Sequence, residues 1–141
     1  GDSALSELTE FLGSDLPPHL QAEFRLGIEQ YNRREFFECH ESLESVWKQY
    51  LETDRELIQG IIQVAVAYYH LERDNFEGCR KLLDRGLGRL RKYRPSHLGL
   101  NMENFVAKVE ADYRLLESEV CLEKDRFAVP KLQFISRRGD C

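Results

Sequence analysis

Two polar side chains one helical turn apart, His40 and Glu44, could do chemistry in a stretch that is otherwise rich in aromatic residues. At 100° per residue they fall on the same helix face as Phe36 and Trp47, so we expect both to point inward. An ionised carboxylate on a dry face is costly unless it is paired, and a histidine four residues earlier is close enough to donate to it. The spacing therefore predicts a buried His–Glu pair.

The next expected helix, residues 56–70, carries a second polar stripe made of Gln59, Gln63 and His70. If the two helices pair antiparallel about a turn near Glu52, Gln63 comes level with the His–Glu pair and His70 lies about a turn and a half further along. One interpretation is that these polar side chains only satisfy one another's hydrogen bonds and fix the pairing of the two helices. Another is that the stripe is the solvent-exposed side of its helix. The third is that the side chains line a ligand pocket. The pocket candidates are His40, Glu44, Trp47, Gln59, Gln63 and His70.

A divalent metal is the sharper form of the pocket hypothesis. His40 and Glu44 have the spacing of two ligands on one helix, and His70 would complete a set of three. The letters H-E-x-x-E resemble the zinc-protease motif H-E-x-x-H, but the second histidine is absent. The helix also turns Glu41, together with Glu38, away from the pocket. We therefore reject a protease and keep a metal-dependent enzyme as an alternative.

Basic side chains crowd the outer face of the expected helix over residues 75–93. On a chain with a formal net charge of −5, this is a local reversal of sign. Such a face either is solvated and balances acids elsewhere or contacts phosphate, RNA or an acidic partner. No aromatic residues interleave with the bases, so stacking on single-stranded nucleic acid is not indicated. The anion-binding candidates are Arg80, Lys81, Arg85, Arg89 and Lys92.

Helical spacing of apolar residues runs through most of the chain. It further predicts a short helix over residues 5–12, a helix that begins near Pro18 and a last helix capped by Asn101. Capping-box pairs mark three other starts: Asn32 with Glu35, Thr53 with Glu56 and Asp74 with Glu77. No paired alternating runs predict a sheet. The fold class is therefore all-α, a single-domain bundle of five to six helices built from antiparallel hairpins.

We expect the helical domain to cover residues 1–121, with its motif core at 22–90, and residues 122–141 to form an extended C-terminal tail. Within that tail, residues 129–135 could dock in extended form. A shift of 40 residues places the stripe of residues 36–50 over that of residues 76–90, which makes tetratricopeptide-like pairing an option. Any two amphipathic helices could superpose about as well.

Composition favours an ordinary globular protein of one domain. The four cysteines, at positions 39, 79, 121 and 141, form no CxxC pair, and two of them fall on apolar helix faces, as expected for reduced thiols in the cytoplasm. The longest apolar run, residues 60–69, is too short to cross a bilayer, and the first residues show no basic leader region. We therefore expect a cytoplasmic location and no membrane partner.

Two motifs occur together in this sequence. Residues 36–47 read aromatic-aromatic-Glu-x-His-Glu-x-x-Glu-x-x-Trp, and residues 59–65 read Gln-Gly-x-x-Gln-x-Ala. In this combination the chain resembles the family called domain of unknown function 309, with Cys39 where a small residue such as alanine is usual. The resemblance implies a small helical bundle without an established activity, and it implies that Glu38 and Glu41 line a groove mouth or meet a neighbouring helix. Its motif positions are Glu38, His40, Glu41, Glu44, Trp47, Gln59, Gly60, Gln63 and His70.

The leading functional hypothesis is a non-catalytic binding or adaptor module for a protein or small-molecule ligand. Its polar pocket would be formed by His40, Glu44 and Gln63 between the two central helices. The alternatives are a metal-dependent enzyme that uses His40, Glu44 and His70, and an anion or RNA binder that uses the basic face of residues 80–94. The pocket hypothesis requires its three side chains to lie together on buried helix faces.

Overall fold

The computed structural model describes residues 16–118 and 121–135. Within them the chain is all-α, with five α-helices and a very small two-stranded sheet. The expected helix over residues 5–12 lies outside the described residues. The helices are α2 (Pro18–Asn32), α3 (Phe36–Gln49), α4 (Arg55–Glu72), α5 (Phe76–Leu90) and α6 (Met102–Glu117).

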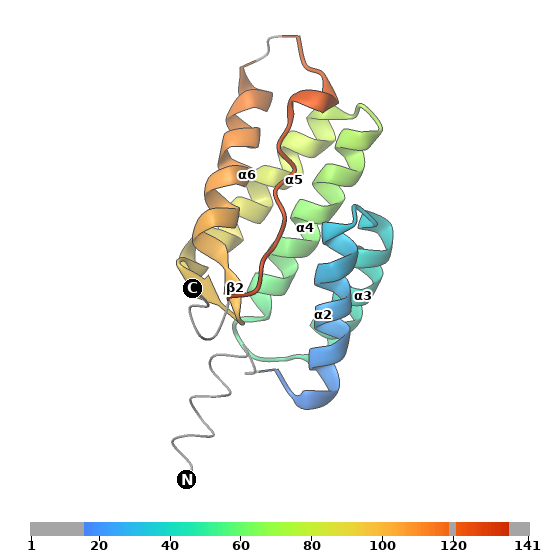
Figure 1. Cartoon of the computed structure of the whole chain (residues 1–141), viewed down its shortest axis with the longest axis vertical. Coiled ribbons are helices and arrows are strands. Elements are labelled where there is room, and N and C mark those ends of the chain that lie inside the picture. The colour runs from blue at the N-terminus through green and yellow to red at the C-terminus, as the bar shows by residue number, and fades with distance from the viewer. Residues whose placement is uncertain (1–15, 119–120, 136–141) are drawn as a thin grey trace.

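Helix α4 is the centre of the bundle. It packs against α3 on one side and α5 on the other, while α2 pairs with α3 and α6 pairs with α5 (Figure 1). Its inner side chains include Leu57, Ile58, Ile61 and Tyr68, which are fully buried. Each such side chain contributes about 1.5–3 kcal/mol of hydrophobic stabilisation. Within the described residues, no helix combines the length and apolar character that a membrane crossing requires.

One of the four expected helix caps forms and three do not. Asn101 accepts a hydrogen bond from the backbone N–H of Asn104 and caps α6 as expected. Neither α3 nor α4 has a side-chain cap. The expected cap Asn32 instead bonds the backbone of Leu132 through both amide atoms, at 2.8 Å each. Asn75, rather than its neighbour Asp74, caps α5. The capping boxes therefore mark the starts of helices within a few residues, although their first residues do not cap these helices.

A short hairpin connects α5 and α6. Strands β1 (Ser96–His97) and β2 (Leu100–Asn101) pair antiparallel, and Leu98 and Gly99 at the turn both have positive φ, at 48° and 78°. Two central residues in this conformation form the kind of turn that joins hairpin strands. The sequence analysis predicts no sheet, because two-residue strands are too short to show an alternating pattern.

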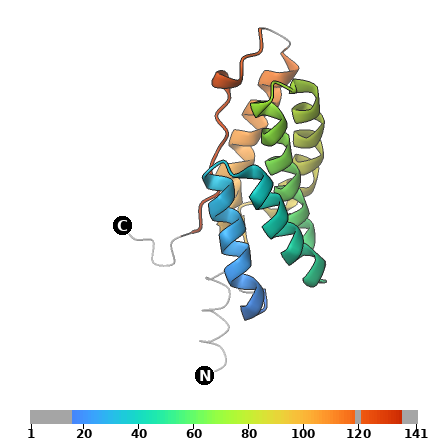
Figure 2. The same ribbon diagram turned by 90° about the vertical axis from the view of Figure 1, so that its right-hand side faces the viewer.

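The C-terminal segment of residues 127–135 runs in extended conformation between α6 and α2 (Figures 1 and 2). Phe127 and Leu132 are buried within the same core as the helices. Asp112 of α6 is also buried, and its carboxylate accepts hydrogen bonds from Tyr68 Oη at 2.7 Å and from the backbone N–H groups of Ala128 and Val129 at 2.9 and 3.0 Å. One buried acid therefore joins α4, α6 and the extended segment.

Candidate functional site

The buried face of α3 is rotated away from the His–Glu pair. Its buried side chains in the helix are Phe36, Cys39, Leu43 and Val46. His40 and Glu44, expected to point inward, have side chains that are 31% and 39% exposed. The expectation of a buried pair is therefore wrong.

The reason for this rotation lies in the position of α2. Its Gln30 accepts a hydrogen bond from Ser42 at 2.7 Å, and its Glu23 accepts one from Ser45 at 3.0 Å. Helix α2 therefore covers the side of α3 that carries Ser42 and Ser45. As a result, the buried face of α3 is centred near Cys39 and not at the edge that faces α4, where His40 and Glu44 lie.

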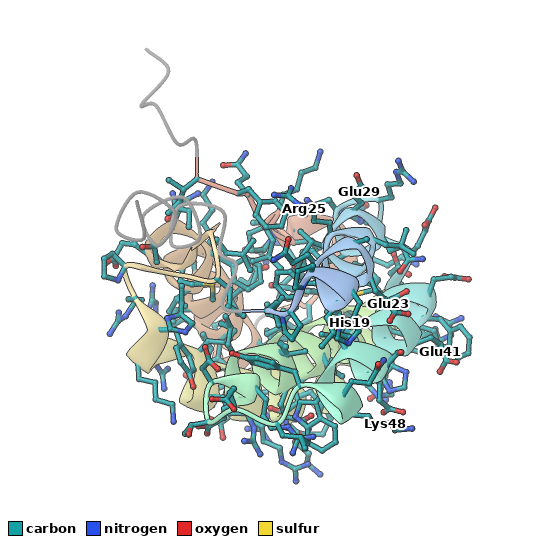
Figure 3. The ribbon with its side chains drawn as sticks, turned by 90° about the horizontal axis from the view of Figure 1, so that it is seen from below. His19, Glu23, Arg25, Glu29, Glu41 and Lys48 are labelled. Atoms are coloured by element: carbon teal, nitrogen blue, oxygen red, sulfur yellow. The ribbon has the colours of Figure 1, made fainter. Side chains whose placement is uncertain are left out.

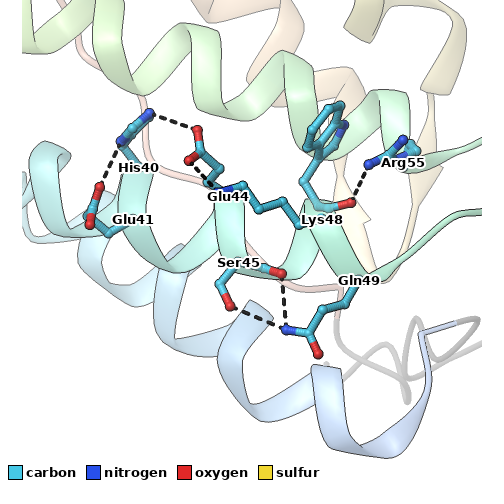
Figure 4. Close-up of polar contacts among 8 residues, drawn as sticks. His40, Glu41, Glu44, Ser45, Lys48, Gln49 and Arg55 are labelled. Atoms are coloured by element: carbon cyan, nitrogen blue, oxygen red, sulfur yellow. Dashed lines mark hydrogen bonds and ion pairs between the residues drawn. The ribbon is translucent and has the colours of Figure 1, made fainter.

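At that edge His40 lies between two carboxylates of its own helix (Figure 4). Its Nε2 is 3.4 Å from Glu44 Oε2, and its Nδ1 is 3.5 Å from Glu41 Oε2. The other oxygen of Glu44 is 3.4 Å from the ammonium of Lys48. Pairs this exposed contribute at most about 1 kcal/mol each, so the group leaves a polar surface that remains available to a partner.

Trp47 continues the same edge toward the end of α3. It is half-buried, and the guanidinium of Arg55 at the start of α4 lies 3.8 Å from the centroid of its ring. Arg55 Nη2 also donates to the Trp47 carbonyl at 2.6 Å. A stacked and hydrogen-bonded arginine holds the indole in place at the turn between the two helices.

The polar stripe of α4 faces α5 instead of the His–Glu pair. Gln63 Oε1 accepts from Arg89 Nε at 3.1 Å, and Arg89 also reaches Glu56 at 3.4 Å. Lys92 forms a second ion pair with Glu56, and its hydrogen bond lowers the pKa of that carboxyl. The structure therefore does not join Gln63 to His40 and Glu44. Gln59 is half-buried in the same stripe.

The structure also does not assemble the expected metal ligands. His70 lies near the end of α4, where its Nδ1 is 3.3 Å from the side-chain nitrogen of Asn75. Among the described residues there is no group of three His, Cys, Asp or Glu side chains that could hold a metal ion. His40 and Glu44 remain a pair, without His70 as a third ligand.

A hollow of about 260 Å³ opens beside His40, between α3 and α4. Its lining is almost wholly apolar and comes from Phe36, Phe37, His40, Val66 and Tyr69. Phe37 is 57% exposed. The hollow is not among the sites predicted from the sequence. The exposed Phe37 directly after the buried Phe36 was a signal that could have indicated it.

Two side chains of opposite charge contact residues that line the hollow, and we call their positions its two lips. On the α3 side, Glu41 contacts His40 and its side chain is 62% exposed. On the α4 side, the guanidinium of Arg73 lies 3.7 Å from the centroid of the Tyr69 ring. Elsewhere on the molecule, the surface of α2 and α3 carries charges of both signs, through Glu23, Arg25, Glu29 and Lys48 (Figure 3). The apolar hollow is thus a local exception on a charged surface.

Three of the five anion-binding candidates are neutralised by ion pairs. Arg80 pairs with Glu77, and both Arg89 and Lys92 pair with Glu56. Lys81 and Arg85 are exposed and form no ion pair with the described residues. The dense run of bases in the sequence therefore becomes an ordinary salt-bridged helix surface with two free cations.

Residues 24–82 match the model of the family described as Domain of unknown function (DUF309). The family resemblance is confirmed. The DUF309 segment contains α3, α4 and all the residues that line the hollow, whereas Arg85, Arg89 and Lys92 lie beyond it.

The chain is also similar to "Uncharacterized protein YpuF" of Bacillus subtilis (strain 168). The two are 32% identical over 94 residues, which is 64% of this chain and 54% of that protein. The chain therefore spans about half the length of this relative.

Proposed function

We propose that this DUF309 protein is a non-catalytic binding module that takes a segment of another protein at the hollow between α3 and α4. The observation that carries the proposal is the hollow itself, with the exposed ring of Phe37 at its edge. Covering a phenylalanine side chain is worth about 1.5–3 kcal/mol, so a partner side chain that fills the hollow gains free energy from apolar contact.

The charges at the lips determine the chemistry of the partner. Glu41 lies on one lip and Arg73 on the other, so a complementary segment carries an apolar anchor between a basic and an acidic residue. The anchor provides affinity, and the flanking charges fix its direction. Glu44, which contacts His40, is a second carboxylate along the same side of α3.

The rigidity of the surrounding surface also supports the proposal. Arg55 holds Trp47 in place further along α3, and Arg73 packs on the ring of Tyr69, which lines the hollow, so these aromatic side chains are ordered before a partner arrives. A surface that is ordered in advance loses less conformational entropy on binding. The buried free thiols of Cys39 and Cys79 fit a reducing compartment, which supports placing this interaction in the cytoplasm.

The test measures binding of a labelled synthetic peptide by fluorescence anisotropy. The peptide carries a Phe-Leu anchor between lysine and glutamate, and a second peptide has the anchor replaced by serines. We expect the first to bind with a Kd on the order of 10 μM and the second not to bind. Phe37→Ala should weaken binding about tenfold, because the ring at the edge of the hollow is lost.

Leu26→Ala is the matched control. Leu26 is 43% exposed on α2 and lies outside the hollow, so its loss should leave the Kd unchanged. Equal binding of the two peptides would contradict the proposal, as would an equal effect of the two alanine variants.

A further inference from the structure

A second cavity, of about 490 Å³, lies between the C-terminal end of α2, helix α6 and the extended segment. It shares no lining residue with the hollow at Phe37. Three cations line it: Arg34, Lys108 and Lys131. No aspartate or glutamate does. On a chain whose formal net charge is −5, a cavity with three cations and no acid is a local concentration of positive potential.

The three cations are not neutralised by the protein. None of Arg34, Lys108 and Lys131 forms an ion pair with the described residues, in contrast to Arg80, Arg89 and Lys92. Like charges brought together without a counter-ion repel one another. An anion in the cavity would relieve that repulsion and form charge-assisted hydrogen bonds with all three.

The walls of the cavity are fixed by hydrogen bonds. Asn32 bonds both the N–H and the carbonyl of Leu132, and Tyr31 Oη donates to the Pro130 carbonyl at 2.7 Å. These bonds hold the extended segment, and with it the backbone of Lys131, against the end of α2. The backbone of Arg34 is set by its own turn, where φ is 63° and its N–H donates to the Tyr31 carbonyl at 2.9 Å.

We infer that this cavity binds a small phosphate-bearing organic molecule. A guanidinium fits two phosphate oxygens at once, and two ammonium groups supply the remaining charge. The volume lies within the usual range for ligand pockets, roughly 300–1,000 Å³, and exceeds what a bare phosphate fills. The side chains of Asn104 and Gln133 also line the cavity, and their amides can bond the neutral part of the ligand.

The test is isothermal titration calorimetry of the full chain at low salt in a phosphate-free buffer. The probes are inorganic phosphate, inorganic pyrophosphate, AMP and adenosine. We expect saturable one-to-one binding of pyrophosphate and AMP, with Kd values below about 1 mM, and no heat from adenosine. Tighter binding of AMP than of inorganic phosphate would identify an organic phosphate as the ligand class, whereas equal affinity would overturn that part of the inference.

Charge-removing variants locate the site. Lys108→Gln and Lys131→Gln should each weaken pyrophosphate binding about tenfold. Lys81→Gln is the matched control, because it removes the same charge from an exposed, unpaired lysine on α5, and it should leave the affinity unchanged. Circular dichroism melts of the three variants should coincide with that of the parent chain.

Three results would overturn the inference. The first is the absence of saturable heat from both pyrophosphate and AMP. The second is an equal loss of affinity in Lys81→Gln, which would show a general charge effect. The third is binding of single-stranded RNA without binding of pyrophosphate, which would show that the cations form a surface for a polyanion. Phe37→Ala should leave pyrophosphate binding intact, so failure here is separate from failure of the proposed function.

Discussion

At the scale of single residues, Asp112 shows most clearly how a polar side chain can be a structural element. It occupies the buried face of α6 together with Phe105, Val109 and Leu116. Asp112 is not among the residues that the sequence predicts to be buried. Its spacing from Val109 and Leu116 nevertheless continues the apolar stripe, and that spacing could have indicated its burial. Its three hydrogen bonds explain why a carboxylate is tolerated there.

Asp112→Asn should lower the free energy of unfolding by about 2–3 kcal/mol. An amide has only one acceptor oxygen, and its NH₂ group would face the hydroxyl and N–H donors that the carboxylate now accepts from. Urea unfolding followed by tryptophan fluorescence measures this. Asp84→Asn, on the exposed face of α5, makes the same chemical change and should stay within about 0.5 kcal/mol of the parent chain. Equal values for the two variants would contradict the role given to Asp112.

The buried thiols predict how stability depends on alkaline pH. Burial raises the pKa of Cys39 and of Cys79 from an ordinary 9.0 to about 12. Between these two pKa values, each thiol keeps its proton in the folded chain but has lost it in the unfolded chain. The contribution of the thiols to the free energy of unfolding is therefore fully present below pH 9 and decreases as the pH rises toward 12. The loss is up to about 1.4 kcal/mol per pH unit for each thiol.

Urea midpoints measured from pH 8 to 11 check this expectation. Cys39→Ala should give a shallower decline, because one of the groups that titrates differently in the two states is gone. Cys121→Ala, which removes an exposed thiol, should keep the slope of the parent chain. A decline as steep in Cys39→Ala as in Cys121→Ala would refute the argument.

At the scale of elements, the contact between α4 and α5 depends on small residues. A Cβ placed on Gly60 would lie 2.7 Å from Leu90 Cδ2, and one placed on Gly86 would lie 2.9 Å from Val64 Cγ2. Gly86 and Gly88 both fit the helix pattern of the sequence, so periodicity alone does not distinguish them. In the structure only Gly86 is at the contact, and a Cβ on Gly88 would meet nothing within 4 Å.

These two glycines form a matched pair for mutation to alanine. Gly88→Ala should raise the free energy of unfolding by about 0.5–1 kcal/mol, because alanine loses less backbone entropy in a helix. Gly86→Ala gains the same propensity but overpacks the interface, which costs about 1–3 kcal/mol, so we expect a net loss. Thermal unfolding followed by circular dichroism measures both, and the same sign for both changes would contradict this account of the contact.

At the scale of the whole molecule, residues 127–135 complete the core that the helices leave open. The division expected from the sequence, a helical domain ending at residue 121 and a separate tail, is a proposal that stability measurements can test. Leu132 is almost fully buried, and the segment bonds α2, α6 and the hairpin through its backbone. These contacts favour one cooperative unit.

Leu132→Ala should therefore destabilise the entire bundle, by about 2–5 kcal/mol. The urea transition of the helices, followed by circular dichroism, should shift to lower urea concentration, because the helices and the segment unfold as one unit. Ile135→Ala is the control, since Ile135 is exposed, and it should have little effect. An unchanged helical transition in Leu132→Ala would show that the tail folds independently.

The sequence by itself determined the helical fold class, the approximate helix boundaries and the family resemblance. Each of these depends on periodicity, end signals or motifs that neighbouring residues carry. It did not determine the rotation of α3, because the centre of a buried arc depends on which helices flank it, and α2 covers the side opposite His40.

Only the tertiary structure decided which distant residues share a site. Phe37 and Tyr69 meet across two helices, and the cations at 34, 108 and 131 meet across almost a hundred positions of the chain. Local periodicity predicts on which face of its helix a side chain lies. Which segments contact one another depends on how the apolar faces of all the helices pack together in the folded chain. Both candidate sites are contacts of that second kind.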